Sequence, residues 1–166
     1  MENKAYEKFV KELKAKVKKQ DKELIFLCIG TNRVIGDSFG PMVGTKLKKL
    51  SKNRNINILG SMKEPMCRKN INRRLKEIKN YQKEKCIIAI DSAISDREEN
   101  IGQIFISNNS MILGSGINRK ILEIGDISIK GVVCQSFKVL ERVPENIIHE
   151  LSNIVAKGIY EVVSNK

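Results

Sequence analysis

Histidine is nearly absent from this chain of 166 residues, in which His149 is the single example. A Ser-His-Asp or Cys-His catalytic unit needs a histidine as its base, and His149 falls within a predicted C-terminal helix, beside its apolar face. Zinc sites also depend on histidines or paired cysteines, and no C-x-x-C sequence is present. These absences leave carboxylates, or an ion held by oxygen atoms alone, as the means of hydrolysis. We expect catalysis by carboxylates, with no metal and no cofactor.

The chain also lacks a long apolar run and an apolar N-terminus. No run approaches the ~18 residues that a membrane-spanning helix requires, and the first residues are charged rather than typical of a signal peptide. The four cysteines fit a reducing compartment, because Cys28, Cys86 and Cys134 lie in apolar, strand-like runs and Cys67 lies among basic residues. We therefore expect a cytoplasmic protein with reduced cysteines and no membrane contact.

Aromatic residues make up only 5% of the chain, whereas positive charge is abundant. The formal net charge is +12, and the first 85 residues hold 23 of the 31 Lys and Arg residues but 9 of the 19 Asp and Glu residues. Such a basic half can attract nucleic acid or other acidic partners, or its lysines can simply coat solvated helices. Because few aromatic side chains are available for base stacking and no known nucleic-acid module is present, we do not expect a nucleic-acid partner.

Alternating apolar segments predict a single α/β domain over residues 1–166. The strands at 24–29 and 86–90 are apolar throughout, which is typical of parallel strands buried on both faces. The alternation of strands and helices predicts a three-layer α/β/α fold with a mostly parallel central sheet, and the strand at 102–107 is expected to lie antiparallel at an edge. Further strands are predicted at 56–59 and 126–134, and helices at 2–20, 38–50, 70–81 and from Pro144 onward.

Two aspartates follow the two most apolar strands. Asp37 lies in a glycine-bounded loop after the strand at 24–29, and Asp91 comes directly after the strand at 86–90. Because parallel strands end at the same edge of a sheet, both carboxylates could converge in the crevice there. Paired carboxylates can share a proton, so that one polarises a carbonyl while the other activates water, or they can hold a divalent ion. The structural alternative is that Asp37 caps the next helix and Asp91 forms a turn.

The glycines near Asp37 predict close backbone packing rather than nucleotide binding. Neither a G-x-G-x-x-G sequence nor a P-loop is present. Gly30 and Gly36 would allow the backbone to turn tightly around the site, and Gly40 would allow the following helix to pack closely.

A second glycine-rich segment, GSGINR at residues 114–119, could turn its backbone N–H groups toward a developing oxyanion. In that arrangement Arg119 would add positive charge and Asn118 would donate a hydrogen bond. A plain turn is an equally good interpretation.

Three segments of the chain resemble the YyaC-like spore proteins, a family of small sporulation-linked proteins of spore-forming Firmicutes. These segments are CIGTNRVIGDSFGPMVGTKL, IIAIDSAIS and ILGSGINRKILEIGDISIKGVV, which together extend over about residues 24–135. The family is related to the germination protease, an atypical aspartic-type peptidase that degrades small acid-soluble spore proteins. That protease is similar in fold to the hydrogenase maturation endopeptidases.

The resemblance implies a sporulation-associated endopeptidase of the forespore or spore core that acts on protein or peptide substrates, such as small acid-soluble spore proteins. It places Asp37 and Asp91 at the two catalytic acids. It assigns substrate binding to a glycine-rich block formed by Gly114, Ser115, Gly116, Asn118 and Arg119. No histidine matches the nickel ligand of the maturation enzymes, so no nickel site is implied. Two alternatives remain open: a non-catalytic protein that uses the fold to bind a peptide, and a metal-dependent peptidase.

Overall fold

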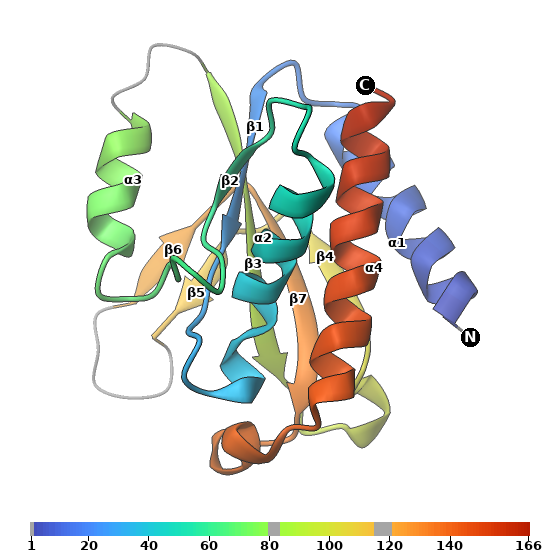
Figure 1. Cartoon of the computed structure of the whole chain (residues 1–166), viewed down its shortest axis with the longest axis vertical. Helices are drawn as coiled ribbons and strands as arrows, with labels where there is room; N and C mark the ends of the chain where they lie inside the picture. Colours follow the sequence, from blue (N-terminus) through green and yellow to red (C-terminus); the bar gives the residue numbers. More distant parts are fainter. Residues whose placement is uncertain (1, 80–83, 115–120) are drawn as a thin grey trace.

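A five-stranded sheet in the order β2-β1-β3-β7-β4 forms the centre of the molecule (Figure 1). The computed structural model describes residues 2–79, 84–114 and 121–166. The strands of this sheet are β1 (Glu23–Cys28), β2 (Asn57–Leu59), β3 (Lys85–Ile94), β4 (Ile104–Ser107) and β7 (Ile127–Cys134). All neighbours in the sheet are parallel except β4, which is antiparallel to β7 at one edge. The predicted α/β fold with a mostly parallel sheet and an antiparallel edge strand is therefore confirmed.

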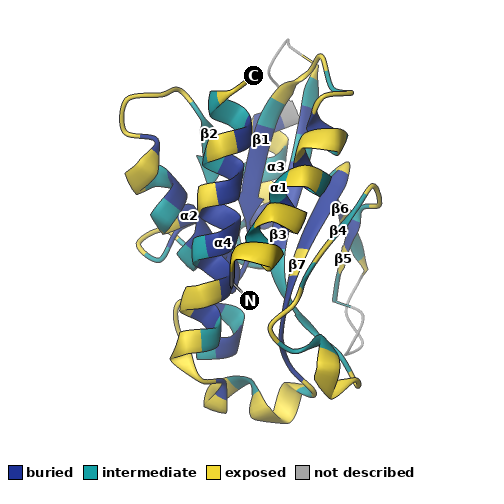
Figure 2. Ribbon diagram, turned by 90° about the vertical axis from the view of Figure 1, so that its right-hand side faces the viewer, coloured by how far each residue is buried: buried dark blue, intermediate teal, exposed yellow. Residues whose placement is uncertain are grey.

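Three helices cover one face of the sheet, and a helix and a β-hairpin cover part of the other. On the first face, α1 (Glu2–Val17), α2 (Phe39–Leu50) and α4 (Glu145–Ser164) pack on apolar side chains that alternate along β3 and β7. On the second face, α3 (Ile71–Lys79) and the hairpin of β5 (Met111–Leu113) and β6 (Leu122–Ile124) pack mainly on β1 and β3. Figure 2 shows the buried strands between helices whose outer surfaces are exposed.

Close packing of α2 on the sheet depends on Gly40, as its position in the sequence predicts. A Cβ atom there would lie 2.1 Å from the carbonyl oxygen of Ile29 and 2.8 Å from that of Ile90. Because no side chain separates the first turn of α2 from the strands, this turn lies directly against the ends of β1 and β3. The helix therefore holds the preceding segment, which contains Asp37, close to the sheet.

Three parts of the predicted secondary structure differ from the structure. The β5–β6 hairpin was not predicted, because its strands are only three residues long and lie between glycine- and serine-rich segments. The first helix ends at Val17 rather than at residue 20. The strand predicted at 86–90 continues as β3 to Ile94, because β7 supplies backbone partners for its polar second half.

Among the described residues, no helix has the length and apolar character needed to cross a membrane.

Candidate active site

Asp37 lies in a short 3-10 turn, η1 (Ile35–Asp37), that folds back onto the end of β1. Its backbone carbonyl accepts a hydrogen bond from the amide of Thr31 at 3.0 Å. Gly30 makes this return possible, since it has a φ of +143° and a Cβ atom there would lie 2.1 Å from the Asp37 carbonyl oxygen. The predicted role of Gly30 is thus confirmed.

The predicted capping of α2 by Asp37 or Ser38 differs in detail from the structure. Ser38 occupies the N-cap position, but its hydroxyl donates to the carbonyl of Ile35 at 2.7 Å and caps no helix amide. Gly36 has no positive φ, and its hydrogen atom leaves room for Leu140, which a Cβ atom would approach within 2.6 Å. Gly36 therefore serves close packing rather than a tight turn.

Asp91 lies inside β3 rather than after it, which corrects the predicted position. The last pair between β1 and β3 joins Cys28 to Ile90, so Asp91 is the first residue of β3 beyond the end of β1. On its other side it remains paired with Lys130 of β7. Its Oδ1 accepts a hydrogen bond from the Ser92 amide at 2.8 Å. The carboxylate thus lies on a strand that is still paired with β7, at the point where β1 has ended and leaves space beside β3.

Both aspartates line one pocket at the carboxyl ends of β1 and β3. Its volume is about 670 Å³, and its other lining residues come from the segment after β1, the loop before α3, the end of β5 and the start of η3 (Phe137–Arg142). The crevice predicted at this edge of an open α/β sheet is therefore present, and Asp37 and Asp91 meet in it.

Burial raises the pKa values of both carboxyl groups, and the charge of Asp37 adds to the rise at Asp91. For Asp91, burial raises the pKa well above its usual value, the charge of Asp37 raises it further, and the Ser92 hydrogen bonds and the charge of Lys130 act against this rise. For Asp37, burial raises the pKa, and hydrogen bonding from Thr31 acts in the opposite direction. Burial thus disfavours the charged form of both carboxyl groups, and the charge of Asp37 adds to this effect at Asp91, so the two groups titrate as a pair.

The rim of the pocket combines positive charge with apolar surface. Arg33 and Lys69 are exposed, and Arg68 is partly buried beside Gly114. Phe137 lines the same pocket with 72% of its surface exposed. The two carboxylates are thus surrounded by cations and an aromatic ring.

Of the predicted glycine-rich block, the structure describes Gly114 alone. Gly114 has a φ of +89°, and a Cβ atom there would lie 2.0 Å from an Nη atom of Arg68. It lines the same pocket as the two aspartates. The other four predicted binding residues lie outside the described part of the chain: Ser115, Gly116, Asn118 and Arg119.

The described residues contain no group of three or more His, Cys, Asp or Glu side chains placed to hold a metal ion. His149 is exposed on α4 and is not among the residues that line the pocket, and its backbone carbonyl accepts a hydrogen bond from Lys46. The two aspartates are thus the acid–base groups of this pocket whose pKa values depart from their usual range.

Sequence reasoning did not single out Arg68, Lys69, Phe137 or Lys130. The first two follow Cys67 in a half of the chain that is rich in Lys and Arg, so their charge alone did not distinguish them. Phe137 and Lys130 carry no recognisable motif. Their proximity to the aspartates depends on the pairing of β3 with β7 and on the path of the chain after β7.

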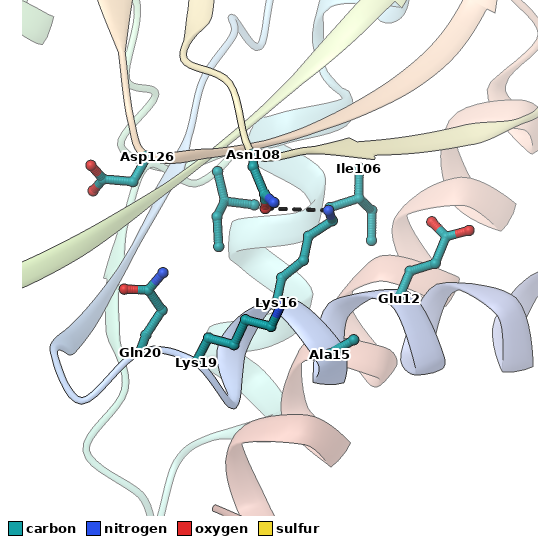
Figure 3. A pocket seen from close by; sticks show the side chains of 9 residues that line it. Glu12, Ala15, Lys16, Lys19, Gln20, Ile106, Asn108 and Asp126 are labelled. Carbon is teal, nitrogen blue, oxygen red and sulfur yellow. Dashed lines mark hydrogen bonds between the residues drawn. The ribbon is translucent and has the colours of Figure 1, made fainter.

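A second pocket of about 640 Å³ lies at the opposite end of the sheet, between α1 and the strands β4 and β7 (Figure 3). There Lys16 extends from α1 and donates a hydrogen bond to the Asn108 side chain at 3.2 Å. Asp126 is exposed, and its Oδ2 accepts a hydrogen bond from the backbone amide of Ile87 at 2.8 Å. These polar groups tie neighbouring elements together.

The three-layer fold, with a mostly parallel sheet and a pocket at the carboxyl ends of its strands, defines an α/β protein of the open-sheet class. The fold is similar to that of the [NiFe] hydrogenase maturation protease HycI from Thermococcus kodakarensis KOD1, with a TM-score of 0.63 and 19% sequence identity. This similarity covers 88% of the present chain and 96% of that protease.

The chain belongs to the family described as "Protein of unknown function (DUF1256)", which matches residues 1–158. It is also 30% identical over 142 residues to "Uncharacterized protein YyaC" of Bacillus subtilis (strain 168). That alignment covers 83% of this chain and 68% of the Bacillus protein. The resemblance to the YyaC-like proteins that the sequence segments predicted is therefore confirmed.

Proposed function

We propose that this protein is a peptide-bond hydrolase in which Asp37 and Asp91 activate water and the scissile carbonyl. The observation that carries the proposal is the meeting of two partly buried carboxyl groups in one pocket, where the charge of one raises the pKa of the other. Such a pair is suited to hold a single proton between its two groups, which is the arrangement that aspartic-type hydrolysis requires. The similarity of the fold to a maturation protease supports the same class of reaction.

In the proposed mechanism, each acid has a distinct role. Asp91, whose pKa is raised further, holds the proton and donates a hydrogen bond to the oxygen of the scissile carbonyl. The ionised Asp37 takes a proton from water, and the resulting hydroxide attacks the carbonyl carbon. Transfer of the proton from Asp37 to the amide nitrogen then lets the C–N bond break, which yields a carboxyl group and an amine.

A cleavage assay on peptides and whole proteins tests this proposal. The wild-type protein is incubated with a proteome-derived peptide library and with small acid-soluble spore proteins, the substrates that the family resemblance favours. Asp37→Asn and Asp91→Asn should each reduce the cleavage rate by about 10²- to 10⁴-fold, because each removes a general acid or base. Thermal unfolding should show that both variants remain folded.

Asp126→Asn is the matched control, since Asp126 is an exposed aspartate in the pocket at the other end of the sheet. It should cleave within about twofold of wild type, in line with the small effects of surface substitutions. Wild-type cleavage rates in either Asp37→Asn or Asp91→Asn would overturn the proposal. Peptide binding without any cleavage by the wild-type protein would instead identify a non-catalytic peptide-binding protein.

The paired carboxylates could also hold a divalent ion, so the assay needs a chelator arm. The proposed mechanism predicts the same cleavage rate before and after treatment with EDTA. Loss of cleavage in EDTA, with recovery on addition of Mg²⁺, Mn²⁺ or Zn²⁺, would show a metal-dependent reaction at the same two aspartates.

A further inference from the structure

A row of three side chains crosses the sheet from the candidate active site to its edge. Asp91 on β3 is paired with Lys130 on β7, and Lys130 is paired with Phe105 on β4. Directly paired residues project from the same face of a sheet, and neighbouring strands lie about 4.8 Å apart. The row therefore extends roughly 10 Å from Asp91 to Phe105, with Lys130 in the middle.

This row lies on a part of the sheet that the described residues leave open. Residues that alternate with it, Ile90 and Ile129, point into the core beneath α1, α2 and α4, so the row projects from the opposite face. On that face, α3 and the β5–β6 hairpin pack on β1 and β3. Lys130 is exposed, and Phe105 is 42% exposed.

The charge of Lys130 is not neutralised by a described carboxylate within salt-bridge distance. The salt bridges among the described residues lie on α1 and α3. In the strand pairing, Lys130 lies directly beside Asp91. Its charge opposes only part of the rise that burial causes in the pKa of Asp91. The strip beside Asp91 thus presents an available cation, followed by a large apolar ring.

We infer that Lys130 and Phe105 bind the substrate polypeptide beside the cleaved bond, with Lys130 selecting a carboxylate and Phe105 an apolar side chain beyond it. This inference rests on the proposed hydrolysis at Asp37 and Asp91. An extended substrate advances about 3.3 Å per residue, and Lys130 lies one strand spacing, about 4.8 Å, from Asp91. The carboxylate that Lys130 selects is therefore one or two residues from the cleaved bond. Either an Asp or Glu side chain or the terminal carboxylate of the substrate could supply it.

Cleavage-site profiling of a peptide library tests the role of Lys130. The library is made by chymotryptic digestion of a bacterial proteome, and the products are sequenced by mass spectrometry. Wild type should show at least a fivefold enrichment of Asp and Glu at one position within two residues of the cleaved bond. Lys130→Met should abolish this enrichment, Lys130→Arg should retain it, and Lys130→Glu should replace it with Lys and Arg.

Three further arms complete the test. Amidation of the peptide C-termini leaves cleavage near internal Asp and Glu residues intact but abolishes cleavage that depends on a terminal carboxylate. Lys52→Met removes an equal charge from an exposed turn after α2 and should leave the wild-type profile unchanged. Phe105→Ala should weaken selection of apolar residues beyond the acidic position.

An unselective wild-type profile, or the same acidic enrichment in wild type and Lys130→Met, would overturn the inference while leaving the proposed hydrolysis in place. If wild type cleaves nothing, the proposed function fails, and the binding strip is tested by peptide capture on immobilised protein. Retention of acidic peptides by wild type and not by Lys130→Met would then support the strip. Equal retention by both, or none by either, would overturn it.

Discussion

The two ends of the central sheet carry pockets of similar size but opposite organisation. At the carboxyl ends of β1 and β3, the pocket brings together Asp37 and Asp91, two partly buried acids of like charge. At the other end, between α1 and β4, Lys16 is bonded to Asn108 and Asp126 is bonded to a backbone amide. One pocket places like charges together, whereas in the other Lys16, Asn108 and Asp126 have hydrogen-bond partners.

This difference distinguishes a pocket with features of a catalytic site from one whose polar groups tie neighbouring elements together. A folded chain gains nothing in stability by holding two carboxylates close together in a partly buried space, because each raises the cost of ionising the other. Groups kept in such an arrangement are candidates for catalysis, where a shifted pKa is useful at neutral pH. Pocket volume alone would not distinguish the two ends, since both measure more than 600 Å³.

The largest effect should come from replacing the glycine that brings Asp37 back to the sheet. Gly30→Ala introduces a Cβ atom 2.1 Å from the Asp37 carbonyl oxygen at a positive φ, so we expect a loss of about 2–5 kcal/mol in unfolding free energy. Gly125→Ala, near the other pocket, has a comparable positive φ, but its closest approach is 3.1 Å. It should cost about 1–2 kcal/mol. Urea denaturation measures both, and equal losses would contradict the special role of Gly30.

A smaller effect, with a distinctive pH dependence, is expected at Asp91. Its raised pKa means that the folded protein holds this proton more tightly than the unfolded chain. Stability therefore falls as pH rises from the unfolded pKa, about 4, toward the higher folded pKa, and the loss is complete above the latter. Asp91→Asn removes this penalty and should raise Tm by about 3 °C or more at pH 7.5, with almost no gain at pH 4.

Asp126→Asn serves as the comparison at the other end of the sheet, where the carboxylate is exposed. Its Tm should stay within about 1 °C of wild type at both pH values, since most exposed substitutions change stability by less than about 0.5 kcal/mol. Scanning calorimetry of the three proteins at pH 4 and pH 7.5 makes the measurement. A lower Tm for Asp91→Asn at pH 7.5 would contradict the buried, repelled state of this carboxyl group.

The smallest effect on stability should come from removing a side-chain hydrogen bond in the second pocket. Lys16→Met removes the hydrogen bond to Asn108, which is exposed, and should lower the unfolding free energy by less than about 1 kcal/mol. Lys19→Met, an exposed lysine that lines the same pocket, controls for the change in net charge and should have a smaller effect still. Neither variant should alter peptide cleavage. A loss of cleavage in Lys16→Met would show that the two ends of the sheet are coupled.

Much of the fold was predictable from local patterns. Continuous apolar runs indicated the two central parallel strands, because strands buried on both faces exclude polar residues. The same runs ended near Asp37 and Asp91, which was enough to direct attention to both acids. The β5–β6 hairpin was missed, because its three-residue strands are too short to show a period and their pairing depends on packing against β3.

By itself, the sequence determined the fold class and singled out Asp37 and Asp91 as the candidate catalytic acids. Its single histidine also turned attention to carboxylate chemistry. These properties are readable because they depend on residue type and on periodicity along a single strand or helix. Only the tertiary structure decided that Asp91 lies within β3, that its pKa is raised further than that of Asp37, and that Lys130 and Phe105 continue the row. Burial, charge repulsion and strand register depend on residues distant in the chain, so no local pattern contains them.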